Sequence, residues 1–335
     1  MRAERRGRPR ADSPVQAGWR AGGAFDVRHH GGFMVIAPDR PVAVRRDTTV
    51  MRQLVALGFG SAALLVAGYL VGVRTTQGQK LDNAAWLGRH IATHQATHGA
   101  RVMLATISVS SLAVAIGVLA LLAFGRGRPR LAIVVGIATF GANLTSEVLK
   151  HFVLTRPVLL AHAPIVKNTY PSGHSTVAMS VAVAAVLVVP HRWRGTVGIV
   201  GFTYAAAIGV ATVVVGWHRP SDVLGGYAVA IGWGAAAALS LALWRGARRA
   251  PDVVAARATP RIASLLAATG VGLIIAAFAV LIGVVGKSDQ LFVLNKTRAF
   301  VAAAVAISAT VALLGAALLT VLRGVTLDPP ALVDD

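Results

Sequence analysis

Cysteine is absent from the 335 residues, so the chain has no disulfide and no thiolate chemistry. Charge is also scarce, because 14% of the residues are charged whereas 55% are hydrophobic. This composition is typical of a polytopic membrane protein and excludes a soluble enzyme with one large core. Acidic residues number 13 against 33 Lys and Arg. The Arg residues adjoin apolar spans, so the excess indicates contact with anionic lipids and no nucleic-acid partner.

Long apolar segments set the fold class. Each is uniformly apolar rather than alternating, which predicts helices and not barrel strands, at about 20 residues per crossing. The eight segments lie near residues 53–73, 102–125, 131–154, 172–190, 196–216, 222–244, 262–286 and 299–322. We therefore predict an all-α, polytopic membrane helix bundle with a six-span core and two additional C-terminal transmembrane helices.

Changes in composition divide the chain into parts. The first 50 residues are rich in Arg, Gly and Pro and lack a hydrophobic period, which predicts a disordered basic tail. A transmembrane catalytic core, a basic cytoplasmic loop, two extra transmembrane helices and a C-terminal tail are expected at residues 51–246, 247–261, 262–323 and 324–335. The residues of the two extra helices indicate no particular role.

Basic residues in the short loops predict the orientation. If the crossings alternate, the loops that begin at Arg126, Arg192 and Arg245 lie on the side of the basic tail. The excess of Lys and Arg marks that side as the cytoplasm. Three polar clusters between the spans then fall on the opposite side. We expect an integral protein of the plasma membrane with a site that faces outside.

The first cluster runs from Gly216 to Asp222. Pro220 suits the first turn of a helix, which places Asp222 in that turn, four residues after His218. A carboxylate there can accept a hydrogen bond from one ring nitrogen and leave the other basic. Without a bound metal, such an imidazole acts as a base or as a nucleophile. In the alternative, Asp222 only caps the helix and His218 lies among the lipid headgroups.

The second cluster is Pro171-Ser172-Gly173-His174, at the start of the fourth span. Free N–H groups at a helix N-terminus, with a glycine that allows close approach, form an anion pocket. His174 lies beside that pocket, where it can give or take a proton. The alternative is an ordinary turn and helix cap.

The third cluster follows the third span and contains Lys150 and Arg156. Both cations can neutralise phosphate oxygens, Arg with two hydrogen bonds. Two alternatives remain at this point. Cations near a helix end often extend to the membrane interface, and Glu147 is spaced to pair with Lys150 on the same helix.

Taken in order, Lys and Arg-Pro, then Pro-Ser-Gly-His, then His-x-x-x-Asp resemble the motifs of the type 2 phosphatidic acid phosphatase (PAP2) superfamily. The resemblance covers about residues 53–245 and implies a metal-independent phosphatase without a cofactor. It implies that His218 is the nucleophile that becomes a phosphohistidine, that Asp222 orients it, and that His174 is the general acid. The phosphate-binding residues that it implies are Lys150, Arg156, Ser172 and Gly173.

Two departures from the family pattern concern phosphate binding. Five residues separate Lys150 from Arg156 where the family usually has six, and one residue turns a helical side chain by about 100°. Thr212 stands where the family's third motif carries an Arg. Arg219, next to His218, is a candidate replacement for that phosphate contact, with a headgroup contact as its alternative.

We expect a membrane phosphatase that hydrolyses a lipid phosphate or diphosphate. The alternatives are a phosphotransferase with the same site and a catalytically weakened protein that binds lipid phosphates as a scaffold. A transporter has little support, because no internal repeat is seen. His90, His94 and His98 recur every four residues, a spacing that can hold zinc, but an interfacial helix is the simpler interpretation and we expect no metal. The oligomeric state is left open.

Overall fold

The structure, a computed structural model, describes residues 48–161, 167–245, 247–249, 258–285 and 295–327. The predicted N-terminal tail lies almost entirely outside these residues. Within them the regular elements are all helices apart from two short strands. The elements are α1 (Thr48–Ala67), α2 (Thr76–Gly88), α3 (His94–Ala105), α4 (Val109–Phe124), α5 (Pro129–Val148), α6 (Gly173–Val188), α7 (Arg194–Val215), α8 (Pro220–Arg245), β1 (Ala247–Arg249), α9 (Ala258–Val285), α10 (Lys296–Val321) and β2 (Val325–Leu327).

The predicted membrane helix bundle is confirmed. Six of the described helices are long and apolar enough to cross a membrane, and a seventh span results if α3 and α4 are counted as one. Each of the eight predicted apolar segments falls on a helix. Two of them differ in detail from the prediction. The segment 102–125 is divided between α3 and α4, which meet at an angle of 58°, and α6 has 16 residues where about 20 are usual.

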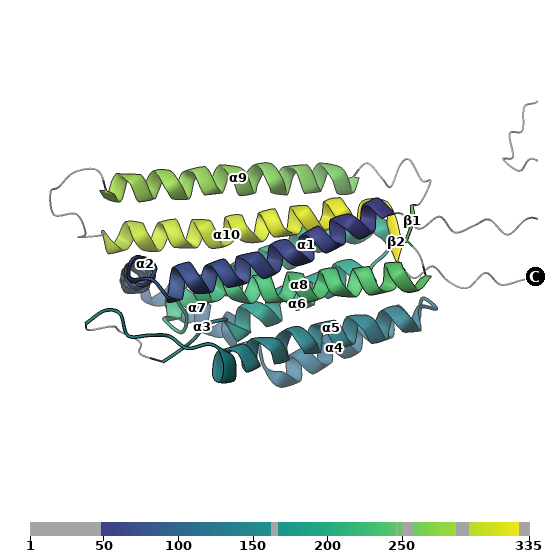
Figure 1. Ribbon diagram of the computed structural model, residues 1–335, viewed down its shortest axis with the longest axis horizontal. Helices are drawn as coiled ribbons and strands as arrows, with labels where there is room; N and C mark the ends of the chain where they lie inside the picture. Colours follow the sequence, from purple (N-terminus) through teal and green to yellow (C-terminus); the bar gives the residue numbers. More distant parts are fainter. Residues whose placement is uncertain (1–47, 162–166, 246, 250–257, 286–294, 328–335) are drawn as a thin grey trace, which may run out of the picture. The chain divides into compact units, whose positions relative to one another are not determined.

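Burial orders the helices from the centre outward. The apolar window of α8 is 67% buried, whereas those of α1 and α9 are 11% buried. The central helix α8 packs against α1, α5 and α6, and α9 packs mainly on α10 (Figure 1). Asp222, in the first turn of α8, is 0% exposed, and such a buried polar group requires partners inside the protein.

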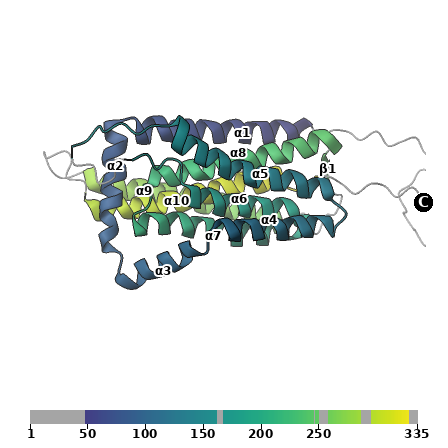
Figure 2. The ribbon, with the colours of Figure 1, turned by 90° about the horizontal axis from the view of Figure 1, so that it is seen from below.

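The helix α2 runs across the ends of the long helices instead of along them (Figure 2). It follows a π-helical turn at Gly68–Val73, and Thr75 caps it by accepting a hydrogen bond from the N–H of Gly78 at 3.0 Å. This placement brings α2 over the N-terminus of α8.

A strand pair lies at the opposite end of the bundle (Figure 1). β1 and β2 pair antiparallel, although the sequence predicted a loop and a tail there. Arg194 is buried beside the pair and donates hydrogen bonds to the carbonyls of Leu322 and Val325, at 3.0 and 2.6 Å. These bonds tie the start of α7 to the C-terminal strand.

Candidate active site

The loop from Gly216 to Asp222 connects α7 to α8 and carries the first cluster. Gly216 ends α7 in the left-handed conformation, with φ of 84°, which favours glycine. The carbonyl of Thr212 accepts a hydrogen bond from the His218 backbone N–H at 3.3 Å. Pro220 then begins α8. His218 is therefore held between two helix ends, and its backbone has little freedom to move.

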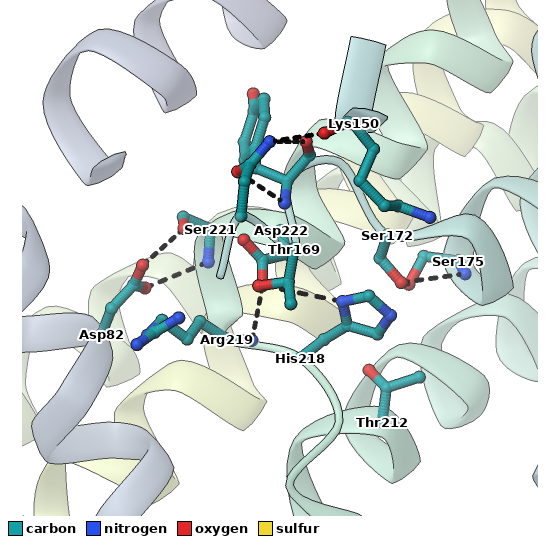
Figure 3. A network of polar contacts seen from close by, with 12 residues as sticks. Asp82, Lys150, Thr169, Ser172, Ser175, Thr212, His218, Arg219, Ser221 and Asp222 are labelled. Carbon is teal, nitrogen blue, oxygen red and sulfur yellow. Dashed lines mark hydrogen bonds and ion pairs between the residues drawn. The ribbon is translucent and has the colours of Figure 1, made fainter. Parts of the chain in front are cut away.

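Asp222 lies in the first turn of α8 and is fully buried. Its carboxylate accepts hydrogen bonds from Arg156 Nη2 (3.2 Å), Thr169 Oγ1 (2.6 Å) and the backbone N–H of Arg219 (2.9 Å). His218 Nδ1 lies 3.6 Å from Asp222 Oδ2, an ion-pair distance slightly longer than a hydrogen bond (Figure 3). That nitrogen is buried and has no hydrogen-bond partner, so Asp222 is the acceptor placed to orient the ring.

The start of α6 carries the second cluster and touches the first. The Ser172 N–H donates a 2.8 Å hydrogen bond to the Asp222 carbonyl, which joins the starts of α6 and α8. Ser172 Oγ caps α6 by accepting from the N–H and hydroxyl of Ser175 (Figure 3). Gly173 follows as the first helical residue. The free N–H groups of this turn therefore lie close to the His–Asp pair.

His174, in the first turn of α6, lies close to His218. The centroids of the two rings are 6.3 Å apart, and the ring of Trp217 lies 5.2 Å from that of His174. Two imidazoles from different helices can therefore act on one bound group, one as nucleophile or base and the other as acid.

Lys150 reaches the start of α6 even though its spacing to Arg-Pro is one residue shorter than usual. A π-helical turn at Leu149–Val153 extends α5, and a π turn holds more residues than an α turn, which changes the direction of the side chains. A Cβ atom added to Gly173 would lie 3.4 Å from Lys150 Nζ. The ammonium group also pairs with Glu147 Oε1 at 2.6 Å. A phosphate that binds Lys150 therefore competes with this carboxylate.

Asn168 joins the Lys150 turn to the second cluster. Its side-chain amide donates to the carbonyls of Lys150, Leu154 and Tyr170, at 3.0, 2.9 and 3.2 Å. Tyr170, whose peptide bond to Pro171 is cis, is fully buried against α8. Gly225 makes room for its ring, because a Cβ there would lie 2.5 Å from Tyr170 Cζ.

Arg156 lies between two buried carboxylates. Its Nη2 is 3.2 Å from Asp222 Oδ1 and 3.9 Å from Asp82 Oδ2. Its Nε and Nη1 are buried without a hydrogen-bond partner. Buried donors usually have an acceptor, so these two N–H groups are available to an incoming anion.

Arg219 does not join the other predicted phosphate-binding residues. Its Nε donates to Asn83 Oδ1 at 2.9 Å, and the guanidinium extends toward Asp82, on the side of His218 away from Ser172 (Figure 3). Burial and the nearby charge of Arg156 lower the pKa of this group. The Thr212 hydroxyl donates to the Gly209 carbonyl at 2.7 Å. Lys150 therefore lies beside Gly173 and Arg156 beside Asp222, whereas Arg219 is held by α2.

Four residues of α2 were missed by the sequence analysis. Gln79, Asp82, Asn83 and Trp86 follow the spacing i, i+3, i+4, i+7, which places them on one face of a helix. The first three are buried, although they are polar. Burial and the charge of Asp222 raise the pKa of Asp82 to about 6. The row of polar residues at helical spacing was the feature of the sequence that could have indicated a buried polar face.

The repeated histidines do not share one helical face. His90 lies in a short 3-10 turn, whereas His94 and His98 lie in α3 after a break in the helix. Within the described ranges, no three His, Cys, Asp or Glu residues are grouped so that they could hold a metal ion.

The fold and the site together define a polytopic membrane protein with two histidines, an aspartate and two cations gathered at one end of a helix bundle. Residues 102–249, less than half of the chain, match the family model described as the PAP2 superfamily. The match bears out the predicted resemblance to this superfamily and supports the predicted enzyme class, a phosphatase. It starts later than the predicted resemblance, which began near residue 53.

Among the solved structures, one similar chain is the crystal structure of a transmembrane PAP2-type phosphatidylglycerolphosphate phosphatase from Bacillus subtilis. The identity is 23%, the TM-score is 0.45, and the alignment covers 55% of this chain and 94% of that one. Among curated proteins, none matches the chain significantly.

Proposed function

We propose that the chain is a membrane phosphatase that hydrolyses a lipid phosphate or diphosphate through a phosphohistidine intermediate. The observation that carries the proposal is the convergence of His218, Asp222 and His174 on one pocket, with His218 Nδ1 next to the buried Asp222 carboxylate. The free face of His218 is directed toward Ser172 and Lys150 (Figure 3). A phosphoryl group bound there would meet a nucleophile, an acid and a cation at the same time.

The proposed reaction has two steps. In the first, His218 Nε2 attacks phosphorus to form an N–P bond, the bond from phosphorus to the leaving oxygen breaks, and His174 gives that oxygen a proton. In the second, His174 takes a proton from water, the water oxygen bonds to phosphorus, and the N–P bond breaks. The products are inorganic phosphate and free His218. Asp222 keeps the other ring nitrogen oriented in both steps.

The developing negative charge has several partners in the pocket. Lys150 Nζ lies close to Gly173, where α6 begins, and Arg156 has two N–H groups without an acceptor. The first N–H groups of α6 have no acceptor within the helix and can also bind an anion. Because these groups can carry the charge of the transferring phosphoryl group, we propose a metal-independent reaction without a cofactor.

An apolar hollow supports a lipid as the substrate. It measures about 280 Å³, lies between α6 and α7, and is lined by residues that include Ala178, Val181 and Gly201. Ala178 follows His174 by four residues, so the hollow begins about one helical turn, roughly 6 Å, from the site. A hydrocarbon chain in this hollow would leave its phosphate at the level of the two histidines.

A substrate panel tests the proposed function. Purified full-length protein in lipid nanodiscs would be given phosphatidate, phosphatidylglycerol phosphate and a polyprenyl diphosphate, each as long-chain and short-chain forms. We expect phosphate release with a higher kcat/KM for long chains, because only these reach the hollow. The His218→Ala protein supplies the background. Release that is equal in both proteins would refute the proposal.

We propose that the site faces outside, at the plasma membrane. The support is the alternation of the crossings, which puts the loops rich in Arg at the other end of the bundle. Because the chain has no cysteine, one introduced thiol reports its own location. We expect Lys167→Cys, an exposed position on the site side, to react with an impermeant maleimide in intact cells, and Arg192→Cys to react only after permeabilisation. The reverse pattern would place the site in the cytoplasm.

A second candidate function is a catalytically weakened protein that binds lipid phosphates. The observation in its favour is the loss of one phosphate contact, because Thr212 replaces the usual Arg and Arg219 extends toward α2. One charge-assisted contact is worth about 1.5–3 kcal/mol. Such a loss would slow the reaction without removing the nucleophile, so turnover separates the two candidates.

A further inference from the structure

One face of α2 is directed at the segments that carry the site. Gln79 Nε2 donates to the Pro157 carbonyl at 2.7 Å, and Trp86 Nε1 donates to the Gly216 carbonyl at 2.8 Å. The first bond holds the residue after Arg156, and the second holds the start of the loop that contains His218. This helix lies before residue 102, outside the segment that matches the family model.

Asp82 is at the centre of that face. It accepts two hydrogen bonds from Ser221, from the N–H at 3.1 Å and from the hydroxyl at 2.5 Å (Figure 3). The N–H belongs to the first turn of α8, where backbone donors have no partner within the helix. Asp82 Oδ2 is also 3.9 Å from Arg156 Nη2. One carboxylate therefore fixes both the start of α8 and a cation of the phosphate pocket.

Asn83 complements Asp82 on the same face. Its Oδ1 accepts from Arg219 Nε at 2.9 Å, so the residue next to His218 is held by α2 rather than by the phosphate pocket. Arg219 is 1% exposed, and a buried guanidinium without such an acceptor is costly. Asn83 thereby fixes the side chain between His218 and Pro220.

The opposite face of α2 rests on α10. Ala84 and Ala85 form a small buried apolar cluster with Ala299. Gly88 lies so close to α10 that a Cβ there would clash with the Lys296 carbonyl oxygen and lie 2.8 Å from Phe300 Cβ. The C-terminal helix therefore supports α2 from behind, on the side away from the site.

We infer that α2 is a positioning element of the active site, that Asp82 and Asn83 are its positioning residues, and that α10 is its brace. The inference rests on the proposed function for its effect on turnover. It gives the C-terminal helix α10 a role, which is to hold α2 in place so that α2 can hold the His218 loop, the start of α8 and Arg156.

Substitutions on α2 test the inference by a split between kcat and KM. For Asp82→Ala we expect kcat to fall by about 10–100-fold with KM within about threefold, because catalytic groups displaced by about 1 Å lose this much. For Asn83→Ala we expect a smaller fall in kcat, because this variant loses only the hydrogen bond from Arg219 Nε. Leu81→Ala, an exposed position on the same helix, is the matched control and should match wild type.

The pH dependence of Asp82→Asn separates positioning from general folding. Asp82 faces Asp222, Arg156, Ser221, Arg219 and Tyr170. Its pKa of about 6 means that wild type carries the neutral acid below that pH and the carboxylate above it. Asn has the shape of the neutral acid, so kcat of the two proteins should converge below pH 6, and the variant should fall behind above it. A constant ratio across pH 5–8 would overturn the role of the charge.

A substitution at the contact between α2 and α10, away from the site, tests the role of α10 as the brace of α2. Gly88→Ala should push α2 away from α10 and lower kcat, although residue 88 touches none of the catalytic groups. Gly99→Ala is the matched control, because a Cβ at Gly99 meets nothing within 4 Å. Equal kcat for these two variants would overturn the brace.

Hydrogen–deuterium exchange of the full-length protein keeps the inference testable if the proposed function fails. Phosphate release at background level from wild type with every substrate would refute the function alone. Exchange in residues 216–222 should still be at least about tenfold faster in Asp82→Ala and Gly88→Ala than in Leu81→Ala and Gly99→Ala, because local opening becomes easier. Unchanged exchange in this loop would refute the positioning role whatever the activity.

Discussion

Replacing His218 with Ala is expected to reduce phosphate release by about 10⁴-fold or more, to the background rate. The substitution removes the proposed nucleophile, and the remaining groups can then only bind and polarise the substrate. The Asp222 carboxylate keeps its contacts with Arg156, Thr169 and the Arg219 backbone, so the pocket should persist. The measurement is single-turnover phosphate release together with the melting temperature of the purified variant.

A matched control and an intermediate trap make this result specific. His98→Ala removes an exposed histidine on α3 and should leave turnover unchanged. Acid-quenched wild type that has been given labelled substrate should retain label on a histidine, and His218→Ala should retain none. Label at the same level in both proteins would contradict the nucleophile assignment. Wild type that binds substrate but neither turns over nor becomes labelled would favour the weakened binding protein.

The sequence was sufficient to predict the helix bundle but not the bend in its second span. Apolar length alone defines a span, and the segment 102–125 is apolar throughout. The break occurs where Ser108 caps α4 in a reciprocal pair with Ser111, at 3.0 and 2.8 Å. Ser108 and Ser111 are therefore the residues in the sequence that indicate a new helix start, and the structure shows that the chain bends by 58° there.

The positions of the candidate-site residues were predictable where local sequence sets the start of a helix. Asp222 and Ser172 lie within the first turn of a helix or directly before it, so the spacing alone places them. The direction of the Arg219 side chain depends instead on Asn83, which is 136 residues away in the chain. The direction of the Lys150 side chain depends on the π-helical turn at Leu149–Val153, which the sequence does not predict. Long-range partners therefore account for what the motifs could not predict.

The polar stripe of α2 was not recognised because its residues suit two environments. Between two apolar spans, Gln79, Asp82 and Asn83 look like an exposed face in the headgroup layer. In the structure they are 3%, 6% and 8% exposed. What decides between the two is the unsatisfied N-terminus of α8, which needs an acceptor such as Asp82. The free N–H groups at the start of α8 thus explain why α2 carries a buried acidic residue.

Replacing Asp222 with Asn is expected to lower kcat by about 10⁴-fold, the loss found when an amide replaces the carboxylate that orients a catalytic histidine. The physical reason is the number of donors around this group. Oδ2 accepts from Thr169 and the Arg219 N–H, so an amide would keep its oxygen there and turn its NH₂ toward Arg156. Two donors then face each other in a buried space, and no negative charge is left to stabilise a charged imidazole at His218.

Thr169→Ser is the matched control for this substitution, because it keeps the hydroxyl that donates to Asp222 and loses only a methyl group. Its kcat should stay within about threefold of wild type. Stopped-flow kinetics should locate the Asp222→Asn defect in the formation of the phosphohistidine rather than in substrate binding, since Lys150 and the N–H groups of α6 are unchanged. An Asn variant with wild-type kcat and a raised KM would show instead that Asp222 serves mainly to hold Arg156 in the phosphate pocket.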